Sequence, residues 1–222
     1  MKKYIKLLFI FVICICVFGC SKKEDKLPTA ESLAFKEEYE ALNDSKRNIS
    51  ISDVNPYVKI TPQELLTKID NKETLYVYFG DPLCPWCRSV LEKSIEVANK
   101  EEIDTIYYIK IWNEEGEEVL RSKYKLNKKN MPELVTPGTN EYYSLIKVFK
   151  DFLSDYALTT SDGKEVKIGE KRIFAPTFIY IEEGVAKKLV TGISDRQTES
   201  NMELSKEILD DEEAIFKEFF TK

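Results

Sequence analysis

The feature that most constrains the fold of this 222-residue chain is a pair of cysteines directly after a strand-like pattern. Leu75–Phe79 is almost wholly apolar and rich in aromatic residues, and the breakers at 80–82 end it. This pattern predicts a central strand buried on both faces. Residues 88–99 carry apolar side chains at helical spacing and contain no breaker. A strand therefore ends and a helix begins at the motif Cys84-Pro85-Trp86-Cys87.

This position favours redox chemistry at the two thiols. A thiol at a helix N-terminus meets unpaired N–H groups and the positive end of the helix dipole, which stabilise its thiolate. The thiolate is the reactive form, and cysteines in such motifs have pKa values of about 3.5–7.5. We expect Cys84 to be the exposed nucleophile and Cys87, one turn later and more buried, to resolve a mixed disulfide. Pro85 suits the first helical turn, and Trp86 offers clients an apolar contact.

A second motif lies about ninety residues further along. Phe174–Thr177 precedes an apolar run at 178–181, and a turn with Gly184 leads into a second run at 185–190. This pattern predicts a β-hairpin that a proline enters.

Strand, C-x-x-C and helix together resemble the active-site segment of the thioredoxin superfamily. The resemblance implies an α/β, thioredoxin-like fold with a central mixed sheet flanked by helices. It also implies that Ala175–Pro176 is a cis bond packed against the cysteine pair, with Thr177 after it. Thioredoxins have a buried Asp six residues before the first cysteine, and Tyr78 stands there in this chain. Asp81 is too close to the motif to be equated with that acid.

The resemblance covers about Thr61–Ile111 and Arg172–Lys222, so residues 112–171 are expected to be an insertion. We expect this insertion to be largely helical, with a helix from about Asn140 to Asp155. It is either a substrate groove beside Cys84 or a decoration packed on the sheet.

The N-terminus predicts export. Residues 1–19 have a basic start and an apolar stretch too short for a comfortable membrane span, typical of a signal peptide. The stretch ends in Gly19-Cys20 and resembles a bacterial lipobox, which implies that Cys20 carries the lipid. Residues 20–30 then form a polar tether, and 31–222 form the thioredoxin-like domain. The protein is expected on the extracytoplasmic face of the membrane; an uncleaved anchor or a signal cleaved without lipid are the alternatives.

Composition narrows the chemistry further. Of five cysteines, Cys14 and Cys16 fall in the signal peptide and Cys20 in the lipobox, which leaves the motif pair. The chain contains no histidine, so catalytic Ser-His-Asp or Cys-His arrangements and typical zinc sites are excluded. We expect no cofactor. A net charge of −6 with interspersed signs argues against nucleic acid as a partner.

Six further elements are expected on either side of the motif. Helices are predicted at 31–42, at 61–70 behind a capping box, and at 203–220. Short strands are predicted at 49–51, 57–60 and 104–111.

These observations predict an exported, lipid-anchored thiol–disulfide oxidoreductase. Its clients are extracytoplasmic protein thiols or disulfides, and a membrane redox partner keeps the pair in its working state. The Pro85-Trp86 dipeptide does not distinguish oxidase, reductase and isomerase. Three alternatives stay open: a non-catalytic thioredoxin-like binding module similar to bacteriocin-transport accessory proteins, a Cu(I) carrier, and a buried cysteine pair that is inert or a permanent disulfide.

Overall fold

The computed structural model describes residues 26–113 and 116–221, over which the chain is a mixed α/β protein with five helices. The expected signal peptide, Cys20 and the first part of the expected tether lie outside the described residues. Within the described ranges, no helix has both the length and the apolar character needed to cross a membrane.

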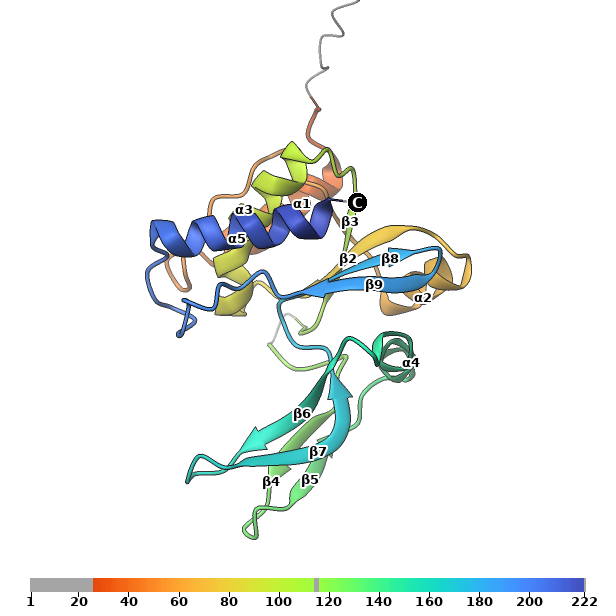
Figure 1. Cartoon of the computed structure of the whole chain (residues 1–222), viewed down its shortest axis with the longest axis vertical. Coiled ribbons are helices and arrows are strands. Elements are labelled where there is room, and N and C mark those ends of the chain that lie inside the picture. The colour runs from red at the N-terminus through yellow and green to blue at the C-terminus, as the bar shows by residue number, and fades with distance from the viewer. Residues whose placement is uncertain (1–25, 114–115, 222) are drawn as a thin grey trace, which may run out of the picture.

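A five-stranded mixed sheet forms the centre of the molecule (Figure 1). Its strand order is β1-β3-β2-β8-β9, in which β1, β3 and β2 run parallel and β8 and β9 pair antiparallel. The strands are β1 (Tyr57–Lys59), β2 (Leu75–Gly80), β3 (Ile106–Lys110), β8 (Thr177–Glu182) and β9 (Val185–Val190). Every residue of β2 is buried, because the strand lies between β3 and β8. The prediction of a central strand buried on both faces is confirmed.

Helices cover both faces of this sheet. The bounds are α1 (Ala30–Glu40), α2 (Pro62–Asp70), α3 (Pro85–Lys100), α4 (Asn140–Phe149) and α5 (Lys206–Phe220). Successive strand side chains point to opposite faces. Tyr76 and Tyr78 of β2 therefore pack with α1, α3 and α5. Val77 and Phe79 pack with α2 and α4.

Local signals explain several of these boundaries. Thr61 and Glu64 form the expected capping box, in which the Glu64 N–H donates to Thr61 Oγ1 over 3.2 Å and the Thr61 N–H to Glu64 Oε2 over 2.7 Å. The expected hairpin is β8–β9, and Gly184 turns it with a φ of +77°, a conformation that glycine adopts without a Cβ clash.

The strand expected at 49–51 is wrong. Ile49 and Ile51 are buried, but their N–H groups donate to the side chains of Asn43 and Glu40 rather than to a neighbouring strand. Side-chain acceptors thus satisfy the backbone that a sheet ladder would otherwise have satisfied.

The expectation that residues 112–171 are largely helical is also wrong. In its described part, this segment holds α4 and two hairpins, β4 (Lys123–Leu126) with β5 (Pro132–Thr136) and β6 (Ser154–Thr159) with β7 (Glu165–Arg172). The expected helix ends at Phe149 instead of Asp155, because the chain from Ser154 pairs with β7. The hairpins project away from the central sheet, while α4 lies against it (Figure 1).

Candidate active site

The two cysteines sit at the junction that the sequence predicts. β2 ends at Gly80, and the Cys84 N–H donates to the Asp81 carbonyl over 3.1 Å, which closes the turn between strand and helix. Cys84 is the N-cap of α3, with φ −78° and ψ 114°, and Pro85 is the first helical residue. The thiols therefore lie at the carboxyl end of a buried strand and the N-terminus of a sixteen-residue helix.

Cys84 is less exposed than expected: only 6% of its surface is accessible, so the prediction of an exposed thiol is wrong. Half-buried Trp86 and Ala175 pack against the cluster that contains it. Its Sγ donates to the Ala175 carbonyl over 3.6 Å. A hydrogen bond from the Cys87 side chain lowers the pKa of Cys84, and N–H groups of Cys87 and Trp86 lower it further against the effect of burial. The thiolate of Cys84 is thus favoured although the side chain is buried.

Cys87 is fully buried and has the opposite character. Burial raises the pKa of Cys87 well above its ordinary value, and the interaction with Cys84 raises it further. A hydrogen bond from Tyr78 works in the other direction and lowers the pKa of Cys87. The site therefore contains one thiol that ionises readily and one that holds its proton.

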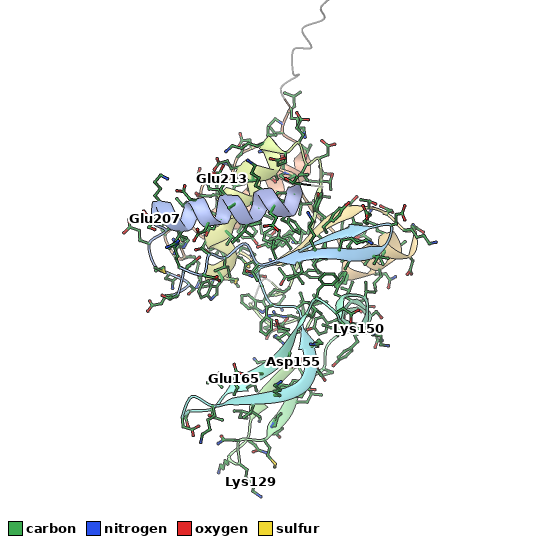
Figure 2. The ribbon with its side chains drawn as sticks, in the orientation of Figure 1. Lys129, Lys150, Asp155, Glu165, Glu207 and Glu213 are labelled. Atoms are coloured by element: carbon green, nitrogen blue, oxygen red, sulfur yellow. The ribbon has the colours of Figure 1, made fainter. Side chains whose placement is uncertain are left out.

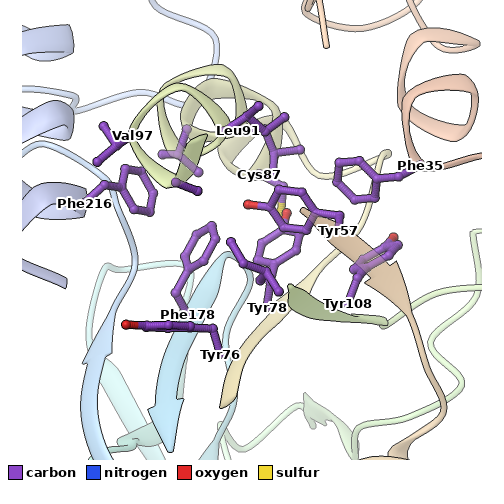
Figure 3. Close-up of a cluster of buried hydrophobic side chains, with 14 of the residues drawn as sticks. Phe35, Tyr57, Tyr76, Tyr78, Cys87, Leu91, Val97, Tyr108, Phe178 and Phe216 are labelled. Atoms are coloured by element: carbon purple, nitrogen blue, oxygen red, sulfur yellow. The ribbon is translucent and has the colours of Figure 1, made fainter. Parts of the chain in front are cut away.

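Buried tyrosines share one cluster with the inner cysteine, and Figure 3 shows Tyr57, Tyr78 and Tyr108 in it. Tyr78 of β2 has its hydroxyl 3.1 Å from the hydroxyl of Tyr39. The Tyr57 hydroxyl lies 2.7 Å from Ser94 Oγ. Tyr108 stacks on Tyr78 with ring centroids 5.6 Å apart, and its buried hydroxyl has no hydrogen-bond partner among the described residues. Burial raises the pKa of Tyr78 well above its ordinary value, so this hydroxyl stays protonated as a donor.

The second predicted motif lies beside the first. The Ala175–Pro176 peptide bond is cis, and it precedes β8. Thr177 is buried, and its Oγ1 donates to the Phe174 carbonyl over 2.7 Å. The predicted residues Cys84, Pro85, Trp86, Cys87, Pro176 and Thr177 thus come from the N-terminus of α3 and the start of β8, and Cys20 lies outside the described residues.

Asp81 lies directly after β2 and belongs to the site, although it is not among the predicted site residues. Its carboxylate is fully buried, with Oδ1 accepting from the Leu83 N–H over 2.8 Å and Oδ2 from the Trp112 N–H over 3.1 Å. Burial raises the pKa of Asp81 to about 6, although both hydrogen bonds lower it. Its position directly after a buried strand and before the motif is the signal that points to it. Asp81 therefore joins the loop at residues 81–84, the cysteine loop, to Trp112, the first residue of the insertion.

Arg88 is a second residue that the pattern did not indicate. It follows Cys87 and is only 1% exposed. Its Nη1 donates to the carbonyls of Tyr39 over 2.7 Å and Pro82 over 3.2 Å. Its other donors reach the carbonyl of Arg47 and the side chain of Asn43. Because these acceptors are spread over residues 39 to 82, a local sequence pattern could not predict that they converge on Arg88.

The described residues contain no group of three or more Cys, Asp or Glu side chains that could hold a metal ion. What the arrangement provides is a pair of free thiols of unequal acidity beside a cis-proline turn. Comparison of the sequence with models of protein families and with curated proteins gives no match.

Proposed function

We propose that this protein has a thioredoxin-like fold and is a thiol–disulfide oxidoreductase that works through Cys84 and Cys87. One observation carries the proposal: two free thiols lie at the N-terminus of one helix, and their pKa values are shifted in opposite directions. Thiol–disulfide exchange needs this difference in pKa. The attacking sulfur must be a thiolate, and the second thiol must stay protonated until the mixed disulfide has formed. The strand order, the C-x-x-C helix and the cis bond support the fold assignment.

In the reducing direction, the Cys84 thiolate attacks a client disulfide. A bond forms between Cys84 Sγ and one client sulfur, the client S–S bond breaks, and the departing thiolate takes up a proton. Cys87 then loses its proton and attacks Cys84 Sγ, which releases the second client sulfur. The client gains two electrons and the protein is left with a Cys84–Cys87 disulfide, which a membrane dithiol partner reduces. The oxidising direction runs these steps in reverse.

The neighbouring groups have roles in this sequence. Tyr78 donates to Cys87 and stabilises its developing thiolate in the second step. Trp86 and the cis-proline turn flank Cys84, where a client chain would bind. The N-terminal sequence supports a site of action outside the cell membrane, anchored by a lipid on Cys20.

A disulfide-reduction assay tests the proposal. With dithiothreitol as donor, the wild type should accelerate insulin reduction, and Cys84→Ser should abolish the acceleration. Equal rates for the two proteins would overturn the enzyme assignment and leave the binding module. Retention of one Cu(I) through desalting, lost in Cys84→Ser, would instead identify a carrier.

The direction of electron flow follows from the reduction potential of the pair, measured against glutathione. About 30 mV corresponds to a tenfold change in the equilibrium constant of a two-electron couple. A potential near that of thioredoxin favours a reductase, and a much higher one favours an oxidase.

A further inference from the structure

A buried ion cluster fixes the insertion to the sheet beside the cysteines. Glu118 accepts from Arg121 over 2.5 Å, from Arg172 over 3.5 Å and from Trp112 Nε1 over 3.3 Å. The side chains of Glu118, Arg121 and Arg172 are at most 10% exposed. Trp112 follows β3 of the central sheet, and Arg172 ends β7, shortly before the chain re-enters that sheet at β8. The Glu118 carboxylate therefore joins the two ends of the insertion.

Hydrogen bonds from the two guanidinium groups to main-chain carbonyls reinforce this junction. Arg121 Nη1 donates to the Ile173 carbonyl over 3.1 Å, and Arg172 Nη1 donates to the Ser122 carbonyl over 2.6 Å. The outgoing and returning segments are therefore held in one register. Such a junction fixes the orientation of the two hairpins relative to the cysteines, which a flexible linker would not do.

A pocket of about 700 Å³ opens at this junction. This volume is in the range of pockets that hold small molecules, so there is room in it for a client side chain. The aromatic rings of Trp112, Tyr124 and Tyr156 contribute to its wall. Its lining also contains the cations Arg121, Lys123 and Arg172, against the carboxylates Glu117 and Glu118.

The charges in this lining favour an anionic group. Glu118 is already shared by two guanidinium groups, whereas Lys123 is exposed at the pocket. The Arg172 guanidinium lies over the Tyr156 ring, 4.2 Å from its centroid. Because Arg172 already donates to the Ser122 carbonyl and to Glu118, it contributes its positive charge to the lining, and exposed Lys123 is the cation best placed to contact a carboxylate.

The pocket lies within a short chain length of Cys84. Arg172 is three residues before Ala175, whose carbonyl contacts Cys84 Sγ, and this stretch spans at most about 11 Å. Phe174 lies between them, is 43% exposed and has its ring centroid 6.0 Å from the Arg172 guanidinium. On the other side, the space beside Gly116 in the pocket wall borders the Leu83 side chain. An extended client segment of a few residues can therefore reach from Cys84 across Phe174 to the pocket.

We propose that this pocket binds an acidic side chain of the client polypeptide, a few residues from the cysteine that reacts with Cys84. The inference rests on the proposed function and adds a client class: cysteines with a nearby Asp or Glu. Lys123 contacts the client carboxylate, the positive charge of Arg172 supports its binding, and the apolar residues of the client lie on Phe174.

The test uses cysteine peptides in disulfide with glutathione. Glu is placed two to six residues on either side of the cysteine, with Gln and Lys peptides as isosteric and opposite-charge controls. At one offset the Glu peptide should have a KM about tenfold below that of the Gln peptide, the effect of one charge-assisted hydrogen bond. Equal KM values at every offset, or a preference for Lys, would overturn the proposal.

A pair of variants on the same hairpin locates the effect. Lys123→Glu reverses a charge in the pocket, and the matched Lys129→Glu reverses one at the hairpin tip, far from the central sheet (Figure 2). Lys123→Glu should bring the ratio of the two KM values to about one, whereas Lys129→Glu should leave it unchanged. If both or neither variant changes the ratio, the pocket is not the recognition site.

A binding measurement separates this proposal from the proposed function. Fluorescence anisotropy of labelled Glu and Gln peptides with Cys84→Ser reports recognition without turnover. Tighter binding of the Glu peptide without exchange in the wild type would keep the recognition site and reject the enzyme. Disulfide exchange in the wild type with equal affinity for the Glu and Gln peptides would keep the enzyme and reject the recognition site.

Discussion

Arg88 carries a permanent charge into the core directly beside the reactive helix turn. Burying a guanidinium is costly unless its donors are satisfied, and all four acceptors here are uncharged oxygens. These acceptors lie at the end of α1, in the loop after it and at Pro82 in the cysteine loop. We infer that Arg88 positions the cysteine loop by tying it to α1.

Arg88→Lys should therefore lower the free energy of unfolding by about 2–4 kcal/mol, because one ammonium cannot reach acceptors on several sides of a planar fork. Chemical denaturation measures the change. Arg196→Lys is the matched control, since Arg196 is 64% exposed and bonds only at the surface, so about 0–0.5 kcal/mol is expected. Equal losses in both variants would refute the role of Arg88.

Asp81 influences Cys84 through its charge. Above its pKa of about 6 Asp81 is ionised, and its negative charge raises the pKa of Cys84. Asp81→Asn removes that charge, so the pKa of Cys84 should fall, by about 0.5–1 unit. The pH dependence of Cys84 alkylation gives the value, with the exposed Asp104→Asn as control. An unchanged or higher pKa in Asp81→Asn would contradict this account.

At the scale of elements, the Tyr78 side chain of β2 packs between the end of its own strand and Cys87 of α3. A Cβ on Gly80 would lie 2.0 Å from the Tyr78 hydroxyl oxygen, so the ring occupies the space above the glycine. Tyr78 contacts the tyrosine cluster and Cys87 from this position. The end of β2 thus needs glycine because Tyr78 fills the site beside the helix.

Gly80→Ala should cost about 2–4 kcal/mol in the wild type, because overpacking forces the ring or the strand to move. In a Tyr78→Val background the same substitution should cost much less, since the ring is absent. A double-mutant cycle by chemical denaturation measures this coupling. Additive losses would show that the glycine is required for another reason.

The elements near the motif could be predicted because their signals are local. A continuous apolar run marks β2, a capping box opens α2, and proline and glycine frame the β8–β9 hairpin. The hairpins of the insertion were not predicted, because β4 and β7 alternate charged and partly buried residues and contain no apolar run. The burial of Asp81 and the Glu118 cluster depend on contacts between segments far apart in the sequence.

At the scale of the whole molecule, α5 closes the core over α3. Glu212 on α5 is fully buried, and neither of its oxygens has a hydrogen-bond partner among the described residues. Burial raises the pKa of Glu212 to about 8, while Lys93 and Arg47 lower it and Glu92 raises it. Glu212 is therefore mostly protonated at neutral pH.

This shift makes global stability depend on pH. The folded pKa of Glu212 exceeds its ordinary value of 4.5, so between about pH 4.5 and 8 the folded protein holds more protons than the unfolded chain. Its contribution to stability is present at low pH and is lost as pH rises through about 8. From pH 7 to pH 9 the wild type should lose about 1.4 kcal/mol relative to Glu212→Gln.

Urea titrations at both pH values test this difference. Glu218→Gln, on an exposed position of the same helix, controls for the loss of one carboxyl group. A parallel pH dependence in the wild type and Glu212→Gln would mean that the buried carboxyl does not govern the stability of the α3–α5 contact.

The most direct test of the central claim is to trap the mixed disulfide. In Cys87→Ser the resolving thiol is gone, so a peptide disulfide should leave a stable adduct on Cys84, identified by mass spectrometry of the protein. In Cys84→Ser the adduct on Cys87 should form far more slowly, because burial raises the pKa of that thiol. Equal adduct formation in both variants, or none on Cys84, would contradict the assignment of Cys84 as the nucleophile.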